Sequence, residues 1–172
     1  TYFFNSQIEE PNPGEDRLMI ESKRRHSYSE IPEMSAKEIT DALLKKIAEK
    51  KYAFIAVNFA NCDLVGHSGD LKAAIEAVEA IDVCLGRIIP EAFKNGYATV
   101  ITGDHGNVEY MIYEDSGEPC PSHTTNPVPL IIGLRGEGRE LREGGELKDI
   151  APTILKILDI PKPKEMTGKS LV

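Results

Sequence analysis

Apolar residues follow two different spacings along the chain, and these predict alternating helices and strands. Spacings of three and four residues, typical of one helix face, occur in residues 36–50, 71–94 and 150–158. Nearly continuous apolar runs, typical of strands buried on both faces, occur in residues 52–59, 97–102 and 128–132. Shorter apolar runs at 2–4 and 17–20 predict two further strand segments. Polar, Gly- and Pro-containing stretches separate these elements and predict loops at 5–16 and 103–127.

Capping residues predict where each helix begins. Ser35 and Glu38 have the spacing of a capping box, and Asp70 and Asp149 can cap the second and third helices. Asn95-Gly96 predicts the end of the second helix. Pro129 indicates an edge strand or the start of a strand. The apolar stripe expected on the second helix consists of Ile75, Val78, Ile81 and Leu85.

The alternation of strands and helices predicts the α/β class, with helices on both faces of a mostly parallel sheet. This is a three-layer α/β/α architecture. Ligand sites in such sheets lie just beyond the carboxyl ends of the strands, so the loops that follow the apolar runs are where functional residues are expected.

Composition excludes several classes of function. The 172 residues fit one domain, and 20 basic against 28 acidic residues give a net charge of −8, which disfavours nucleic-acid binding. No apolar run approaches the roughly 20 residues of a membrane span, so no membrane partner is expected. The odd, widely spaced cysteines Cys62, Cys84 and Cys120 predict free thiols and a cytoplasmic protein.

Histidine and aspartate residues gather at the expected sheet edge. Asp63 and His67 follow the run 52–59, Asp104 and His105 follow the run 97–102, and His123 precedes the run 128–132. Imidazole and carboxylate groups together suit Mn²⁺ or Zn²⁺, and five such groups suit two ions about 3.5–4 Å apart. Taken singly, each pair is more often a surface or capping feature, so the residues alone leave the metal and structural interpretations open.

Other polar residues give weaker signals. His26 lies in a basic stretch and is expected to be solvated. Ser68 lies in Gly66-His67-Ser68-Gly69, which is not the G-x-S-x-G nucleophile motif. Ser122, Thr124 and Thr125 flank His123 without a distinguishing feature, so the residues select no nucleophile.

Several longer stretches, taken together, resemble one family. They are TYFFN at 1–5, EEPNPGEDR at 9–17, PEMSA at 32–36, NFANCDLVGHSGD at 58–70, TGDHGNVE at 102–109, HTTNPVP at 123–129, DIAPTIL at 149–155 and EMTGKSL at 165–171. Their order and spacing resemble the carboxyl-terminal part of the cofactor-independent (2,3-bisphosphoglycerate-independent) phosphoglycerate mutases of the alkaline phosphatase superfamily. The resemblance covers essentially the whole chain.

The resemblance implies an alkaline-phosphatase-like fold that is incomplete in this chain, with residues 1–172 forming the carboxyl-terminal part of the metal-binding domain. It implies interconversion of 3-phosphoglycerate and 2-phosphoglycerate in glycolysis and gluconeogenesis through a phosphoserine intermediate. Two divalent ions, Mn²⁺ or else Zn²⁺, Co²⁺ or Mg²⁺, would serve without 2,3-bisphosphoglycerate. By motif, Asp63, His67 and His123 would hold one ion, and Asp104 and His105 the other. The full-length protein would be a cytoplasmic monomer.

The chain also departs from the family pattern. In the family, the nucleophilic Ser and a neighbouring Asp ligand lie upstream of the matched region, and the substrate-binding domain is an insertion that is absent here. The chain begins at Thr1 rather than Met, so it is expected to be a part of the enzyme and to be inactive as a mutase alone. Ser6-Gln7 stands where the family commonly has Gly-Gly, and Cys62 where Gly is common. Phosphopentomutase, a metal-dependent phosphatase and a non-catalytic metal-binding module are the alternatives.

Overall fold

The computed structural model describes residues 5–23, 26–136, 138 and 140–172. Its helices are α1 (Ala36–Glu49), α2 (Asn61–Gly66), α3 (Leu71–Lys94) and α4 (Ile150–Ile157), and its strands are β1 (Thr99–Thr102) and β2 (Leu130–Gly133). Short 3-10 helices, η1 (Tyr28–Glu30) and η2 (Leu147–Asp149), precede α1 and α4. The strand predicted at 2–4 lies outside the described residues.

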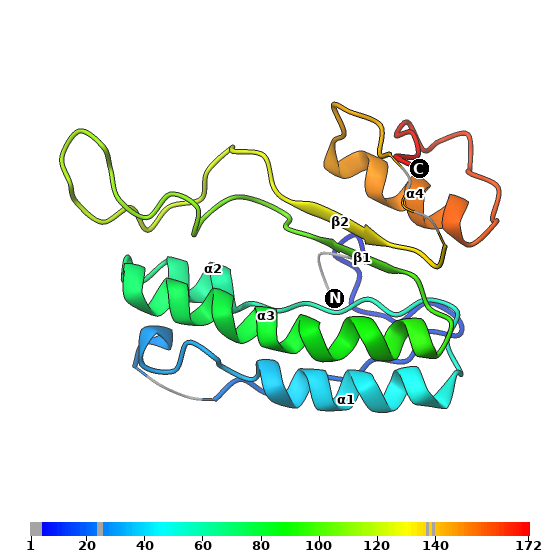
Figure 1. The fold of residues 1–172 in the computed structure, drawn as a ribbon, viewed down its shortest axis with the longest axis horizontal. Coiled ribbons are helices and arrows are strands. Elements are labelled where there is room, and N and C mark those ends of the chain that lie inside the picture. Colours follow the sequence, from blue (N-terminus) through cyan, green and yellow to red (C-terminus); the bar gives the residue numbers. More distant parts are fainter. Residues whose placement is uncertain (1–4, 24–25, 137, 139) are drawn as a thin grey trace.

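Helices and strands form layers, and the α/β class is confirmed. Figure 1 shows α1 and α3 side by side on one side of the β1–β2 pair, with α4 on the other side. The loops that follow β1 and precede β2 extend together beyond the strands, above α2. This places the chain between residues 103 and 127 next to the short helix α2.

The two strands pair antiparallel, with Thr99 opposite Gly133 and Thr102 opposite Leu130. Strands were expected in both places, and β2 begins directly after Pro129, as a proline at a strand start predicts. The mostly parallel sheet is not formed within the described part of the chain, where this antiparallel pair is the whole sheet.

The strand predictions at 52–59 and 17–20 are wrong for this chain. Among the residues that the structure describes, neither segment pairs as a strand, and Leu18 and Met19 are 61% and 80% exposed. In the segment 52–59, Ile55 and Phe59 pack against the α1–α3 core, whereas Val57 is 41% exposed. A strand needs hydrogen-bonded neighbours, and the described residues provide none at these positions.

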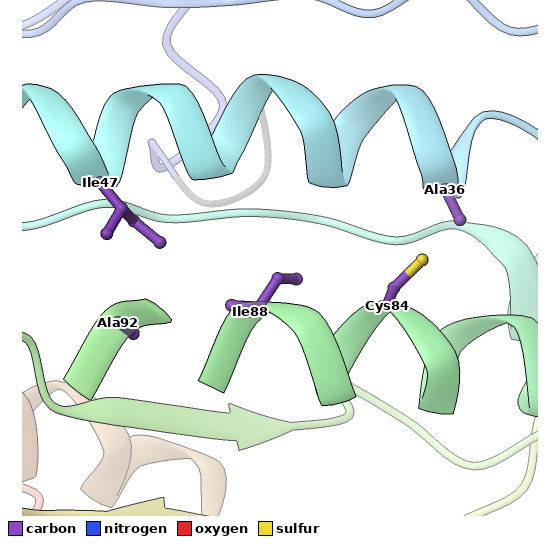
Figure 2. Packing of buried hydrophobic residues seen from close by; sticks show 5 residues of the cluster. All are labelled: Ala36, Ile47, Cys84, Ile88 and Ala92. Atoms are coloured by element: carbon purple, nitrogen blue, oxygen red, sulfur yellow. The ribbon is translucent and has the colours of Figure 1, made fainter. Parts of the chain in front are cut away.

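The main core lies between α1 and α3 (Figure 2). Its buried members are Ala36, Ile47, Cys84, Ile88 and Ala92. The apolar stripe predicted for α3 is wrong in its first turns, because Ile75 and Val78 are 51% and 45% exposed. Small residues, Ala73 and Ala77, face the interior instead and allow α2 to pack closely through Val65, which is fully buried.

The predicted caps differ in outcome. The Asp70 carboxylate accepts a hydrogen bond from Ala73 N at 3.0 Å, so this N-cap is confirmed. Asn95 ends α3 and Gly96 follows with a φ of +90°, as predicted. The capping box at Ser35 is wrong, because the Ser35 hydroxyl donates to the main-chain oxygen of Glu21 at 3.0 Å and does not cap the helix.

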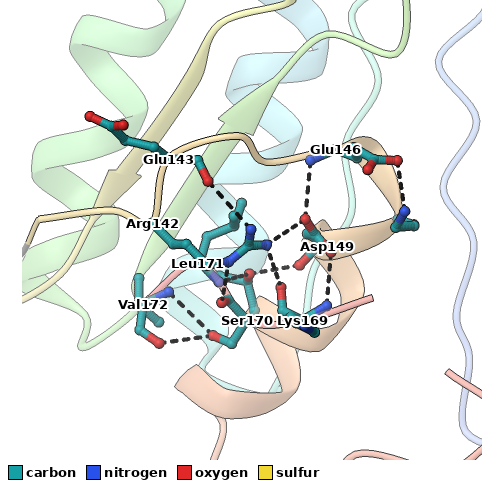
Figure 3. A network of polar contacts seen from close by, with 10 residues as sticks. Arg142, Glu143, Glu146, Asp149, Lys169, Ser170, Leu171 and Val172 are labelled. Carbon is teal, nitrogen blue, oxygen red and sulfur yellow. Dashed lines mark hydrogen bonds and ion pairs between the residues drawn. The ribbon is translucent and has the colours of Figure 1, made fainter. Parts of the chain in front are cut away.

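Asp149 precedes α4, as predicted, but its side chain does not cap that helix. It forms hydrogen bonds with the carboxyl-terminal tail instead (Figure 3). Its carboxylate accepts from Lys169 N at 2.8 Å, from Glu146 N at 3.1 Å and from Arg142 Nη2 at 2.6 Å. The main-chain donors of Lys169 and Glu146, followed by Arg142, lower the pKa of Asp149 to about 2. The last residues of the chain are therefore tied to α4.

The sequence also predicted free cysteines and no membrane span. Cys62, Cys84 and Cys120 are free, as predicted. Within the described ranges, no helix has both the length and the apolar character that crossing a bilayer requires.

Candidate metal centre

The short helix α2 carries the first two candidate ligands. Asp63 lies in its first turn and His67 is its C-cap residue, with the His67 N–H donating to Asp63 O at 3.0 Å. The four-residue spacing places both side chains on the same face. The sequence predicted an irregular segment here, because α2 has only six residues and no side-chain cap at its start.

His105 and His123 come from two loops that run next to each other. An isolated antiparallel bridge joins Gly106 to Thr124, and Thr124 N donates to Gly106 O at 3.0 Å. Each histidine therefore lies one residue from the bridge. Main-chain hydrogen bonding, rather than the strands themselves, sets how the two imidazoles face each other.

Three ligand atoms form a small triangle. Asp63 Oδ1 lies 2.9 Å from His123 Nε2 and 3.1 Å from His67 Nε2. The two imidazole nitrogens lie 3.0 Å apart. Ligands at Zn-type distances of 2.0–2.1 Å in a tetrahedral site would be about 3.3 Å apart. The triangle is slightly tighter than this, so the residues fit a first-row divalent ion with a small expansion.

His105 adjoins this triangle. Its ring stacks on that of His123 with centroids 3.7 Å apart and an interplanar angle of 21°. His105 Nε2 lies 3.8 Å from Asp63 Oδ1, and ligand atoms of Asp63, His105 and His123 all lie within 4.8 Å of one another. Four of the five predicted ligands therefore converge.

Asp104 is the predicted ligand that the structure does not bring into this cluster. Its side chain is 85% exposed, and its Oδ1 lies 3.7 Å from His105 Nε2. The chain bends at Asp104 and His105, and the Asp104 side chain remains in solvent while His105 stacks on His123.

Main-chain acceptors orient two of the imidazoles. His67 Nδ1 lies 2.7 Å from Pro121 O, and His105 Nδ1 lies 3.3 Å from Gly106 O. A carbonyl oxygen only accepts, so Nδ1 is the donor in each of these contacts, and Nε2 is the ring nitrogen that faces the cluster. This is the arrangement that prepares an imidazole to bind metal through Nε2.

Asn107 connects the loop after β1 to α2. Its Nδ2 donates to Asp63 Oδ1 at 3.3 Å and also lies 3.4 Å from Asp63 O. Asn107 is only 4% exposed and packs directly against Gly66, where an added Cβ would lie 2.3 Å from Asn107 Oδ1. Asn107 lies within the stretch TGDHGNVE, but no signal in the sequence predicted a role for it.

Glu109, from the same stretch, was also missed. Its carboxylate accepts from Asn107 N at 2.6 Å, from Asn126 Nδ2 at 3.0 Å and from the Thr124 hydroxyl. Burial acts to raise the pKa of Glu109, but the hydrogen bonds, that of Thr124 first, outweigh it and the pKa lies below the ordinary value. Only the spacing to His105 within the quoted stretch could have suggested it.

The Ser68 hydroxyl and the Cys62 thiol lie near the cluster in the sequence. The Ser68 hydroxyl donates to Val65 O at 2.6 Å and accepts from Asp70 N at 3.1 Å, which fixes it at the end of α2. Burial raises the pKa of the Cys62 thiol, which disfavours the reactive thiolate. Neither group has the environment of an activated nucleophile.

Comparison with known proteins adds a family and several relatives. The sequence matches the Metalloenzyme superfamily over residues 1–162. It is 49% identical over 173 residues to a 2,3-bisphosphoglycerate-independent phosphoglycerate mutase of Clostridioides difficile (strain 630), covering 100% of this chain and 34% of the relative. It is 53% identical over 173 residues to the enzyme of the same name from Desulforudis audaxviator (strain MP104C), covering 100% of this chain and 33% of the relative.

A solved structure is also similar. It is described as a Leishmania mexicana phosphoglycerate mutase at low cobalt concentration, and it matches with a TM-score of 0.90 and 30% sequence identity. The match covers 99% of this chain and 34% of that one. The chain thus spans about a third of the length of each of these proteins.

Proposed function

Since this chain belongs to the Metalloenzyme superfamily, we propose that its clustered Asp and His side chains hold divalent metal for phosphoryl transfer. The observation that carries the proposal is the triangle of Asp63 Oδ1, His67 Nε2 and His123 Nε2, with sides of 2.9–3.1 Å. Divalent ions held there would supply charge neutralisation for a phosphoryl group and lower the pKa of a hydroxyl nucleophile.

The ligands divide into two proposed sets. Asp63, His67 and His123 would hold one ion, and Asp104 and His105 would contribute to a second. The first set lies on α2 and one loop, and main-chain or side-chain hydrogen bonds fix it. In the second set the Asp104 side chain is exposed to solvent, so we expect the ion of this set to be bound more weakly. Mn²⁺ is the expected metal, with Zn²⁺, Co²⁺ or Mg²⁺ as alternatives.

The proposed substrate is phosphoglycerate, and the reaction is the interconversion of its 3-phospho and 2-phospho forms in the cytoplasm. The names of the relatives support this choice. A net charge of −8 offers no general attraction for an anion, so attraction of the phosphoryl group to this chain would depend on metal held by these ligands. The nucleophilic Ser and the phosphoglycerate-binding arginines would come from the remaining two-thirds of the enzyme, so the chain alone would be inactive.

Two alternatives remain distinguishable. A phosphopentomutase or phosphatase would use the same metal ligands with a different phosphate ester. A non-catalytic module would bind metal without supporting turnover in any context. The high identity to proteins that are all named phosphoglycerate mutases favours the glycerate reaction over both.

A chimera tests this proposal directly. The corresponding third of the Clostridioides difficile mutase would be replaced by this chain, and conversion of 3-phosphoglycerate would be followed with enolase in the presence of Mn²⁺. We expect turnover by the chimera, no turnover by this chain alone, and loss of turnover with Asp63→Asn. The exposed helix residue Asp82 gives a matched control, since Asp82→Asn removes the same charge away from the site.

The outcomes separate the alternatives. Turnover of ribose 5-phosphate but not of 3-phosphoglycerate would favour phosphopentomutase activity. A folded, metal-loaded chimera without turnover of either ester would contradict the proposed function. Mutase activity of the isolated chain would contradict the expectation that the nucleophile lies elsewhere.

A further inference from the structure

Glu109 joins the two loops that carry His105 and His123. One carboxylate oxygen accepts from Asn107 N, on the His105 loop, at 2.6 Å. The other accepts from Asn126 Nδ2 at 3.0 Å and from the Thr124 hydroxyl, both on the His123 loop. The carboxylate thus spans the gap between the loops next to the bridge that pairs them.

Glu109 is an exposed residue, but its carboxylate lies close to the main chain of Gly106. A Cβ added at Gly106 would lie 2.1 Å from Thr124 Oγ1 and 2.4 Å from Glu109 Oε1. The absence of a side chain at Gly106 is therefore what allows the carboxylate to approach the bridge.

The same carboxylate also reaches the third ligand-bearing segment through Asn107. The Asn107 main-chain N–H is held by Glu109, while its side chain donates to Asp63 Oδ1 at 3.3 Å. Asn107 is buried between the loop and α2. Glu109 therefore has direct hydrogen bonds to the segments that carry His105 and His123, and Asn107 links it to Asp63.

We propose that Glu109 is a positioning residue, which sets the spacing of His105 and His123 and the orientation of Asp63 for metal binding. The inference rests on the proposed metal site and adds to it a residue that does not itself bind the ion. Its chemistry is specific to a carboxylate. An ionised carboxylate accepts at both oxygens, whereas the amide of glutamine directs N–H donors toward donors already present.

The test measures Co²⁺ binding by calorimetry and by the visible absorption of bound Co²⁺, which reports ligand geometry. Glu109→Gln keeps size and removes acceptor capacity, and Glu114→Gln is the matched control, because Glu114 is exposed on the same loop. We expect Glu109→Gln to weaken Co²⁺ binding about 10–100-fold and to change the absorption band, as removal of groups that orient ligands does elsewhere. Glu114→Gln should bind within about twofold of the unsubstituted chain.

Thr124→Val provides a second variant should Glu109→Gln fail to fold. It removes one donor to the carboxylate, keeps the side-chain volume, and is expected to weaken Co²⁺ binding less than Glu109→Gln while still changing the absorption band. Folded Glu109→Gln or Thr124→Val protein with unchanged affinity and an unchanged band would overturn the positioning role alone. Failure of the unsubstituted chain to bind Co²⁺ would instead overturn the metal site on which this inference rests.

Discussion

Adding a methyl group at Gly66 is expected to destabilise the protein, although the same change in an open helix position stabilises. Gly66 ends α2, and a Cβ there would lie 2.3 Å from Asn107 Oδ1 and 2.7 Å from Asn107 Cγ. Asn107 is 4% exposed, so its side chain has no free space to enter. The added methyl must therefore displace either α2 or the loop after β1.

Gly86 provides the matched comparison. It also lies in a helix, α3, but a Cβ there would meet no atom within 4 Å. Replacing a helical glycine by alanine gains about 0.5–1 kcal/mol when nothing else changes. Overpacking a filled position costs about 1–3 kcal/mol. Gly86→Ala should therefore stabilise by about 0.5–1 kcal/mol, and Gly66→Ala should destabilise by about 1–2 kcal/mol.

Thermal unfolding followed by circular dichroism measures both variants. For a domain of this size, about 1 kcal/mol corresponds to a Tm change of about 2–4 °C. We expect Gly66→Ala to lower Tm and weaken metal binding, since it displaces Asn107 from Asp63, while Gly86→Ala raises Tm and leaves binding unchanged. Equal increases in Tm for both variants would refute the close packing of α2 against Asn107.

Three further predictions follow from other parts of the molecule. Ser6 and Gln7 have φ values of +54° and +64°, which L-residues adopt only with strain. Glycine at both positions should therefore raise the free energy of unfolding by about 1 kcal/mol in denaturant titrations. A lower free energy of unfolding would contradict this. The pKa of Asp149 is lowered to about 2 from 3.8, so its carboxylate stabilises the fold above about pH 4 and this contribution disappears as pH falls through 2. Asp149→Asn should thus flatten the loss of stability between pH 4 and 2, and an unchanged pH profile would argue against it. Imidazole binds metal only when neutral, so the affinity for Mn²⁺ should fall about tenfold or more from pH 8 to pH 6, and equal affinities by calorimetry would contradict the histidine ligands.

Local patterns predicted α1, α3 and α4 but missed the six-residue α2, because the signals that define the longer helices lie within each segment. The periodic residues of α1 and α3 and the Asp70 cap need only neighbours along the helix. Ser35 does not cap the helix, because its hydroxyl donates a hydrogen bond to Glu21 O, which is distant in the sequence. The apolar stripe predicted for α3 is wrong where α2 packs against it. The close approach of α2 favours the small residues Ala73 and Ala77 at the contact, and Ile75 is exposed instead.

The apolar segment 52–59 shows the limit of pattern reasoning for strands. Its composition is that of a strand buried on both faces, yet Val57 is 41% exposed and the segment has no ladder in the described residues. A strand forms only where other segments of the chain hydrogen-bond to it. The apolar pattern of one segment does not show whether such segments are present.

The convergence of the candidate ligands could be predicted from the sequence, but the hydrogen bonds that support them could not. Asp63, His67, His105 and His123 are residue types with a recognisable chemistry at recognisable places, and the fold brings them together. Asn107 and Glu109 form hydrogen bonds that join loops to each other and to α2, and such loop contacts have no periodic signal in the sequence. The exposure of Asp104 likewise depends on the direction of one peptide, which composition does not determine.

Mn²⁺ binding with and without the Asp63 carboxylate tests the central claim most directly. Asp63 Oδ1 is the atom to which His67, His105 and His123 all converge, at 3.1, 3.8 and 2.9 Å. Free and bound Mn²⁺ would be distinguished by electron paramagnetic resonance for the unsubstituted chain, for Asp63→Asn and for the control Asp82→Asn. We expect one tightly bound Mn²⁺ in the unsubstituted chain and in Asp82→Asn, and none in Asp63→Asn. Undiminished binding by Asp63→Asn would contradict the metal centre.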